Sequence, residues 1–153
     1  MIHARQKIRE AVARLLARNP VAWKSVTESR IASTMQTWPY LMVFADNELS
    51  EQIDVTDPGT YDRTVTINVV GMLRLPGTGD TYTIEDRMDE CAAEIETKLT
   101  QSAMRDEVQI GTAALTSTGM EVIIEEDGID HAEVILSYQI GYTTQEGSPG
   151  SFI

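Results

Sequence analysis

The fold is decided by residues 132–142, AEVILSYQIGY, in which every second residue is apolar. Successive side chains of a β-strand point to opposite faces of a sheet, so this spacing predicts one long strand with a continuous face on the core. The core-facing positions are Ala132, Val134, Leu136, Tyr138, Ile140 and Tyr142.

A shorter alternating segment, residues 120–124, precedes this strand and predicts the other arm of a hairpin. A two-residue turn at Asp127-Gly128 would place Ile124 opposite His131, which mixes apolar and charged side chains on one face. A three-residue loop that starts at Asp127 instead pairs Ile124 with Ala132. We therefore predict a turn with a glycine-assisted bulge.

Three segments in the first half of the chain have the patterns of strands. Residues 40–44, YLMVF, form a short apolar run that favours a buried strand. A turn at Asp46-Asn47 is expected to separate it from a half-buried strand over 49–55, and residues 61–75 alternate over a longer strand. The segment between them and the N-terminal helix has no clean pattern, and a short strand within 23–31 is one interpretation.

Two segments have the spacing of amphipathic helices. In residues 2–18, apolar side chains recur every three or four positions until Asn19-Pro20 ends the pattern. The second helix is expected to begin at Thr83, which stands three residues before Asp86 as in a capping box, and its apolar stripe runs through Cys91 to residue 99.

The order of these elements predicts the fold class. Runs of strands with short connections, and no repeated βαβ crossover, favour an α+β fold with a mostly antiparallel β-sheet packed on one face by two main helices. A chain of 153 residues has room for one domain of this kind. We expect a single domain over residues 1–143 and a flexible tail over 144–153.

Composition excludes several classes of function. The net charge is −12, yet residues 1–30 carry seven lysines and arginines against Glu10 and Glu28. An acidic body argues against nucleic-acid binding as the main activity, because that binding depends on cationic contacts. Cys91 is the only cysteine, so there is no internal disulfide. Neither a membrane span nor a signal peptide is predicted, and we expect a soluble protein made in a cytoplasm.

No catalytic constellation is recognisable, and we predict neither an enzyme nor a cofactor site. The sharpest chemical hypothesis is a metal site near the hairpin turn, because residues two apart on a strand point the same way. The same residues also suit the solvent face of an acidic hairpin, which is the interpretation we favour over a specific metal site. The weak metal candidates are Asp127, Asp130, His131 and Glu133.

Cys91 is predicted to pack in the core rather than act as a nucleophile, since Asp89, Glu90 and Glu94 beside it would raise a thiol pKa. His3 is too close to the chain start for a positioned catalytic role.

The order of these patterns resembles that of phage tail terminator (tail-completion) proteins. It comprises a basic amphipathic helix, Trp38-Pro39 before an apolar strand, a long strand after Tyr61-Asp62-Arg63, an acidic helix and the closing strand from Val134 to Tyr142. The resemblance spans most of residues 4–143.

The resemblance implies a non-catalytic virion protein, assembled in the host cytoplasm and placed at the tail end or neck. Such a protein forms a ring, typically of six subunits, that ends the tail tube, binds the tail tube protein and meets a head-completion or neck protein. DNA would pass through the acidic lumen without specific binding. We expect no membrane contact.

A ring needs two different complementary patches on each subunit. The opposite charges of the N-terminal helix and the acidic body suggest Arg5, Arg9 and Arg14 as candidate subunit-interface residues. Two alternatives stay open, namely another neck or head-tail connector subunit and a ligand- or metal-binding α+β domain.

Overall fold

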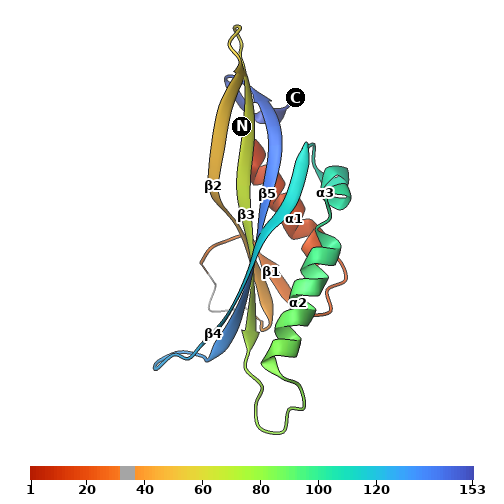
Figure 1. Cartoon of the computed structure of the whole chain (residues 1–153), viewed down its shortest axis with the longest axis vertical. Coiled ribbons are helices and arrows are strands. Elements are labelled where there is room, and N and C mark those ends of the chain that lie inside the picture. Colours follow the sequence, from red (N-terminus) through yellow and green to blue (C-terminus); the bar gives the residue numbers. More distant parts are fainter. Residues whose placement is uncertain (32–36) are drawn as a thin grey trace.

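A computed structural model of the chain describes residues 1–31 and 37–153 (Figure 1). Its elements, in chain order, are α1 (Ala4–Ala17), β1 (Ser25–Thr27), β2 (Tyr40–Asp54), β3 (Thr60–Arg74), α2 (Ile84–Lys98), α3 (Gln101–Glu107), β4 (Thr112–Ile123), β5 (His131–Gln145) and β6 (Ser148–Phe152).

The strands of the described residues form one sheet in the order β1-β2-β3-β5-β4, with β6 paired to β5. Only β1 and β2 are parallel; the other pairings are antiparallel. The two long strands β3 and β5 pair along their whole length, from Thr60 opposite Gln145 to Arg74 opposite His131. These two strands form the centre of a tall, twisted sheet (Figure 1).

The alternating face of β5 is buried as its sequence predicts. None of its six apolar positions is more than 3% exposed. Val65, Ile67 and Val69 of β3 are 0% exposed and belong to the same core. Both strands show this face to the helices, so their pairing forms the centre of the sheet side of the core.

Helices α1 and α2 lie over one face of the sheet (Figure 1). In α2, the Thr83 hydroxyl accepts a hydrogen bond of 3.1 Å from the Asp86 amide, which confirms the predicted cap. Cys91 is 0% exposed, and burial raises the pKa of its thiol to about 12. Its predicted role in the core is confirmed, and so is the α+β class with a mostly antiparallel sheet.

The region predicted as two strands around a turn at Asp46-Asn47 is the single strand β2. A β-bulge between Ala45 and Glu48 shifts the register against β3 there. The extra residue reverses which side chains face the helices, so Leu49 and Ile53 point to solvent and are 71% and 55% exposed. The expected half-buried strand is therefore an exposed part of the β2–β3 hairpin.

The hairpin register also differs from the prediction. Val122, rather than Ile124, lies opposite Ala132. The shift keeps every side chain on its expected face, because it amounts to one full repeat of the strand pattern. It lengthens the connection from three residues to 124–130. β4 also begins at Thr112, well before the predicted segment.

Two further elements were not predicted. Helix α3 follows α2 after a break at Leu99 and Thr100, and the Thr100 hydroxyl accepts a hydrogen bond of 3.1 Å from the Ala103 amide. Within the tail 144–153, which was expected to be flexible, the structure instead has the end of β5 and strand β6. Lys7 Nζ donates a hydrogen bond of 2.6 Å to the Gly150 carbonyl, which links β6 to α1.

Candidate assembly interface

Strand β4 is a sheet edge that carries exposed apolar side chains. It is last in the strand order and pairs only with β5 in the part of the chain that the structure describes. Met120 is 56% exposed, Val122 45% and Leu115 38%, although all three face the same side as the core residues of β5. An open edge of this kind favours pairing or packing with another chain.

The exposure follows from where the helices end. Near its start, Ala113 is only 9% exposed because α3 and its connection lie beside it. Farther along, β4 and β5 diverge from the helices, and the loop that joins them projects beyond the end of β3 (Figure 1). The apolar face of the edge strand is therefore most exposed in its far part, at Met120 and Val122.

The connection at the tip of this hairpin, residues 124–130, contains both acidic and apolar side chains. We call it the acidic loop. Its acids are Glu125, Glu126, Asp127 and Asp130. Ile124 is 70% exposed and Ile129 47%. Among the ion pairs of the described residues, none involves an acid of this loop. The loop thus presents uncompensated negative charge beside exposed isoleucines.

The four residues considered for a metal have separate roles. His131 and Glu133 do lie together, with Nε2 3.2 Å from Oε1, while Nδ1 of His131 lies 2.8 Å from the Ile129 carbonyl. Burial tends to lower the pKa of His131, but these two hydrogen bonds raise it on balance. Asp130 instead accepts a hydrogen bond from the Glu125 amide, and Asp127 is exposed. Across residues 1–31 and 37–153, no three such side chains are placed to hold a metal ion.

The three candidate interface arginines are each paired within the chain. Arg5 lies 3.3 Å from Glu48, Arg9 3.3 Å from Glu28, and Arg14 3.5 Å from Glu107. Arg18 also pairs with Glu107. Acids from β2, α3 and the β1 region thereby neutralise much of the basic helix, so its charge is less available to a neighbour than the sequence suggests.

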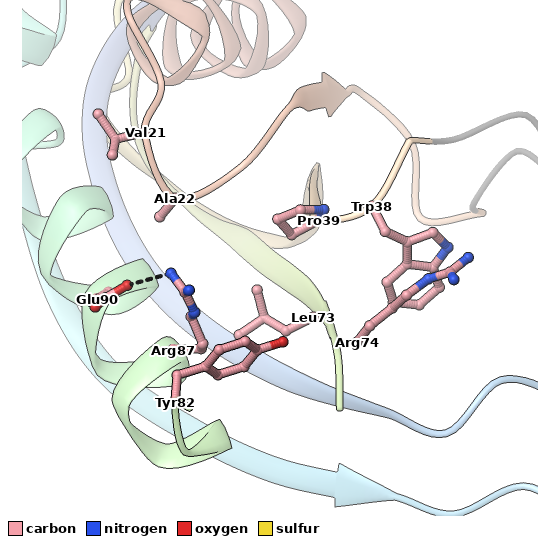
Figure 2. Close-up of a pocket in the computed structure, with 9 residues that line it drawn as sticks. All are labelled: Val21, Ala22, Trp38, Pro39, Leu73, Arg74, Tyr82, Arg87 and Glu90. Carbon is pink, nitrogen blue, oxygen red and sulfur yellow. Dashed lines mark hydrogen bonds and ion pairs between the residues drawn. The ribbon is translucent and has the colours of Figure 1, made fainter. Parts of the chain in front are cut away.

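A pocket of about 300 Å³ opens where α2 begins, between that helix, the end of β3 and the start of β2 (Figure 2). Two arginines, each stacked on an aromatic ring, define it. The Arg87 guanidinium lies 4.2 Å from the centre of the Tyr82 ring, and the Arg74 guanidinium lies 5.4 Å from the centre of the Trp38 ring. We call it the arginine pocket. It is lined by Val21, Ala22, Trp38, Pro39, Leu73, Arg74, Tyr82, Arg87 and Glu90.

Leu73 lies between the two arginine–aromatic pairs (Figure 2). It is 5% exposed, so it closes the pocket toward the core. Arg87 pairs with Glu90 at 3.1 Å, whereas the structure describes no ion pair for Arg74. The pocket therefore has two cations and one anion around an apolar floor.

Sequence reasoning missed this pocket. Its residues come from four separate segments, and neither arginine belongs to a motif. The one usable signal was Trp38, an aromatic residue of the kind that anchors cores and interfaces.

Among the described residues, none of the helices combines the length and hydropathy that a membrane-spanning segment needs.

No protein-family model matches the chain, and no curated protein matches it. Among solved structures, the chain is similar to one from the virion of a native gene transfer agent particle, with 11% identity and a TM-score of 0.46 over 93% of this chain and 92% of that chain. A likeness at this level carries no argument about function.

Proposed function

We propose that the chain is a structural virion protein that assembles into a closed ring, ends the phage tail tube and provides the docking face for the head. The observation that carries this proposal is the edge strand β4, whose apolar face is exposed over its projecting half. A monomer gains nothing from exposing such a face, whereas a neighbouring subunit that covers it removes the apolar surface from water.

The shape of the subunit supports a ring rather than a two-fold dimer. The projecting β4–β5 hairpin lies on one side of the molecule and the helices on the other (Figure 1). Two different patches on opposite sides form head-to-tail contacts, and these close into a ring when the rotation between subunits allows it. In this proposal, the candidate arginines of α1 make secondary contacts at the rim of the interface between subunits.

The net charge of −12 suits a subunit around a DNA passage. An acidic lumen repels phosphate groups, so the duplex can slide instead of being held by cationic contacts. A neck or head-tail connector subunit would use the same ring, and only the structure that it binds distinguishes the two functions.

Electron microscopy of the purified protein, alone and mixed with tail tubes, tests the proposal. Rings alone and capped tube ends in the mixture are the expected result. Rings that bind the head-side vertex but leave tube ends bare would move the assignment to a neck subunit. Particles of single-subunit size in both samples would refute the ring.

A matched pair of variants tests the role of β4. Val122→Glu places a charge on the exposed apolar face and should abolish rings without unfolding the subunit. Ala114→Glu adds the same charge to the same strand, but Ala114 lies opposite Gln139 on the other face and is exposed. It should leave ring formation intact. Equal effects of the two substitutions would show that the apolar face of β4 is not the contact.

A further inference from the structure

Given the ring proposed above, we propose that the acidic loop of one subunit docks in the arginine pocket of its neighbour. The loop, residues 124–130, is the tip of the β4–β5 hairpin, and the pocket lies at the start of α2. This proposal identifies the surface on each of the two subunits in contact, whereas the exposed edge strand identifies a surface on only one of them.

The charges of the two surfaces are complementary. The acidic loop carries four carboxylates that have no ion-pair partner among the described residues. The arginine pocket carries Arg74 and Arg87 against the single carboxylate of Glu90. Arg87 already pairs with Glu90, whereas Arg74 stacks on Trp38 and has no ion pair among the described residues, so its N–H edge can bind a carboxylate with two parallel hydrogen bonds. Docking would supply each surface with the charge that its own chain lacks.

Apolar side chains match in the same place. Ile124 and Ile129 flank three of the four acids of the loop and are 70% and 47% exposed. The pocket has an apolar floor at Leu73 and an apolar wall that includes Val21, which is 90% exposed. A volume of about 300 Å³ accommodates one or two side chains rather than a whole element. Insertion of the loop tip fits this size.

The positions of the two surfaces also suit a closed ring. Figure 1 shows the β4–β5 hairpin and the first turn of α2 at the same end of the molecule, with the hairpin directed to the opposite side. In a cyclic ring the two halves of the contact must lie at the same height along the axis. The tip of the hairpin points away from its own α2 (Figure 1), while His131, directly after the loop, lies opposite Arg74 at the edge of the same subunit's pocket.

The start of β5, directly after the acidic loop, contacts one wall of the same subunit's pocket. The ring of His131 at the start of β5 lies 5.9 Å from that of Trp38, which in turn stacks with Arg74. The wall of the pocket that would receive one neighbour's loop is therefore in contact with the hairpin that would reach the other neighbour.

Charge reversal tests the contact, because it can be cancelled by a second reversal. The pocket variant is Arg74→Glu with Arg87→Glu; the loop variant is Glu126→Lys with Asp127→Lys. Glu126 and Asp127 are exposed and have no hydrogen bond in the described structure, so the loop variant should fold normally. Each variant alone should weaken self-association about tenfold or more, measured by sedimentation velocity.

Mixing the two variants is the decisive step. A pocket variant then offers an acidic pocket to the two lysines of the altered loop, and a loop variant offers a basic pocket to an acidic loop, so both contacts of an alternating ring are restored. The mixture should assemble as the unmodified protein does. Arg105→Glu, an exposed change on α3, serves as a control that should leave assembly unchanged.

Two results would overturn the inference: assembly of either variant at the unmodified strength, or two deficient variants that stay apart when mixed. Both presuppose that the unmodified protein forms rings, so they reject the docking contact while the ring stands. An unmodified protein that never assembles would instead reject the proposed function itself.

Discussion

Glu48 joins three parts of the molecule through one buried carboxylate. Its side chain is 7% exposed and lies 3.3 Å from Arg5 of α1 and 3.2 Å from Arg63 of β3. It also accepts a hydrogen bond from the Tyr142 hydroxyl of β5. Burial of that hydroxyl, together with this hydrogen bond, raises the pKa of Tyr142. The bulge in β2 creates the site, since it turns Glu48 toward the helices.

Glu48→Gln should destabilise the fold by about 2 kcal/mol, because it removes the charge that two guanidinium groups share in a buried position. Urea unfolding at neutral pH measures the change. Glu51→Gln, an exposed change on the same strand, is the control and should stay within about 0.5 kcal/mol of the unmodified protein. Equal costs for the two substitutions would mean that the Glu48 cluster contributes no stability.

Gly71 and Cys91 meet where α2 packs on β3. A Cβ atom added at Gly71 would lie 2.8 Å from the Cys91 sulfur. Gly71→Ala should therefore cost about 2 kcal/mol of stability through overpacking. The same substitution should cost at least about 1 kcal/mol less in a Cys91→Ala background, where the space is free. If the stability costs of the two substitutions were strictly additive, the strain from Gly71→Ala would not come from contact with Cys91.

At the scale of elements, we expect the two threonines at the start and end of α2 to affect its stability in opposite ways. Thr83 caps the helix. Thr97 is exposed in the last turns of the helix, and its hydroxyl donates a hydrogen bond to the Ala93 carbonyl. Thr83→Ala should cost about 1 kcal/mol. Thr97→Ala should gain up to about 0.5 kcal/mol, because alanine has the higher helix propensity. Thermal unfolding that shows the same sign for both would contradict the assigned cap.

The strand and helix patterns of the sequence predicted the core elements well, and the failures have physical causes. The bulge between Ala45 and Glu48 reverses the phase of β2, and no residue type marks it. Matching apolar faces does not fix the hairpin register, because a shift of one full repeat matches the faces equally well. Helix α3 is too short for an apolar stripe to be visible. These features are set by tertiary contacts rather than by local sequence.

The candidate interface was predictable only in part. The acidity of residues 125–130 can be read directly from the sequence, yet that segment was interpreted as a solvent face or a weak metal site. Arg5, Arg9 and Arg14 were chosen for their charge, and the structure pairs each of them within the chain. Arg74 and Arg87 lie in segments without any motif, and folding alone brings them together. Pairing of charges across distant segments cannot be read from one sequence.

At the scale of the whole molecule, the subunit has two unlike surfaces at one end. The projecting hairpin carries exposed apolar side chains and uncompensated acids, and the pocket beside α2 carries arginines. This asymmetry is what a head-to-tail ring requires of its subunit. In the ring that we propose, part of the net charge of −12 lies in the contact between subunits and part lines the passage for DNA.

The mass of the purified protein in free solution tests the central claim most directly. Sedimentation equilibrium should give a discrete species whose mass is a fixed multiple of the 17.0 kDa subunit, with a plateau as concentration rises. A plateau distinguishes a closed ring from an open chain of head-to-tail contacts, which would keep growing. A single species of 17.0 kDa at every concentration would contradict the claim that this chain is built to assemble into a ring.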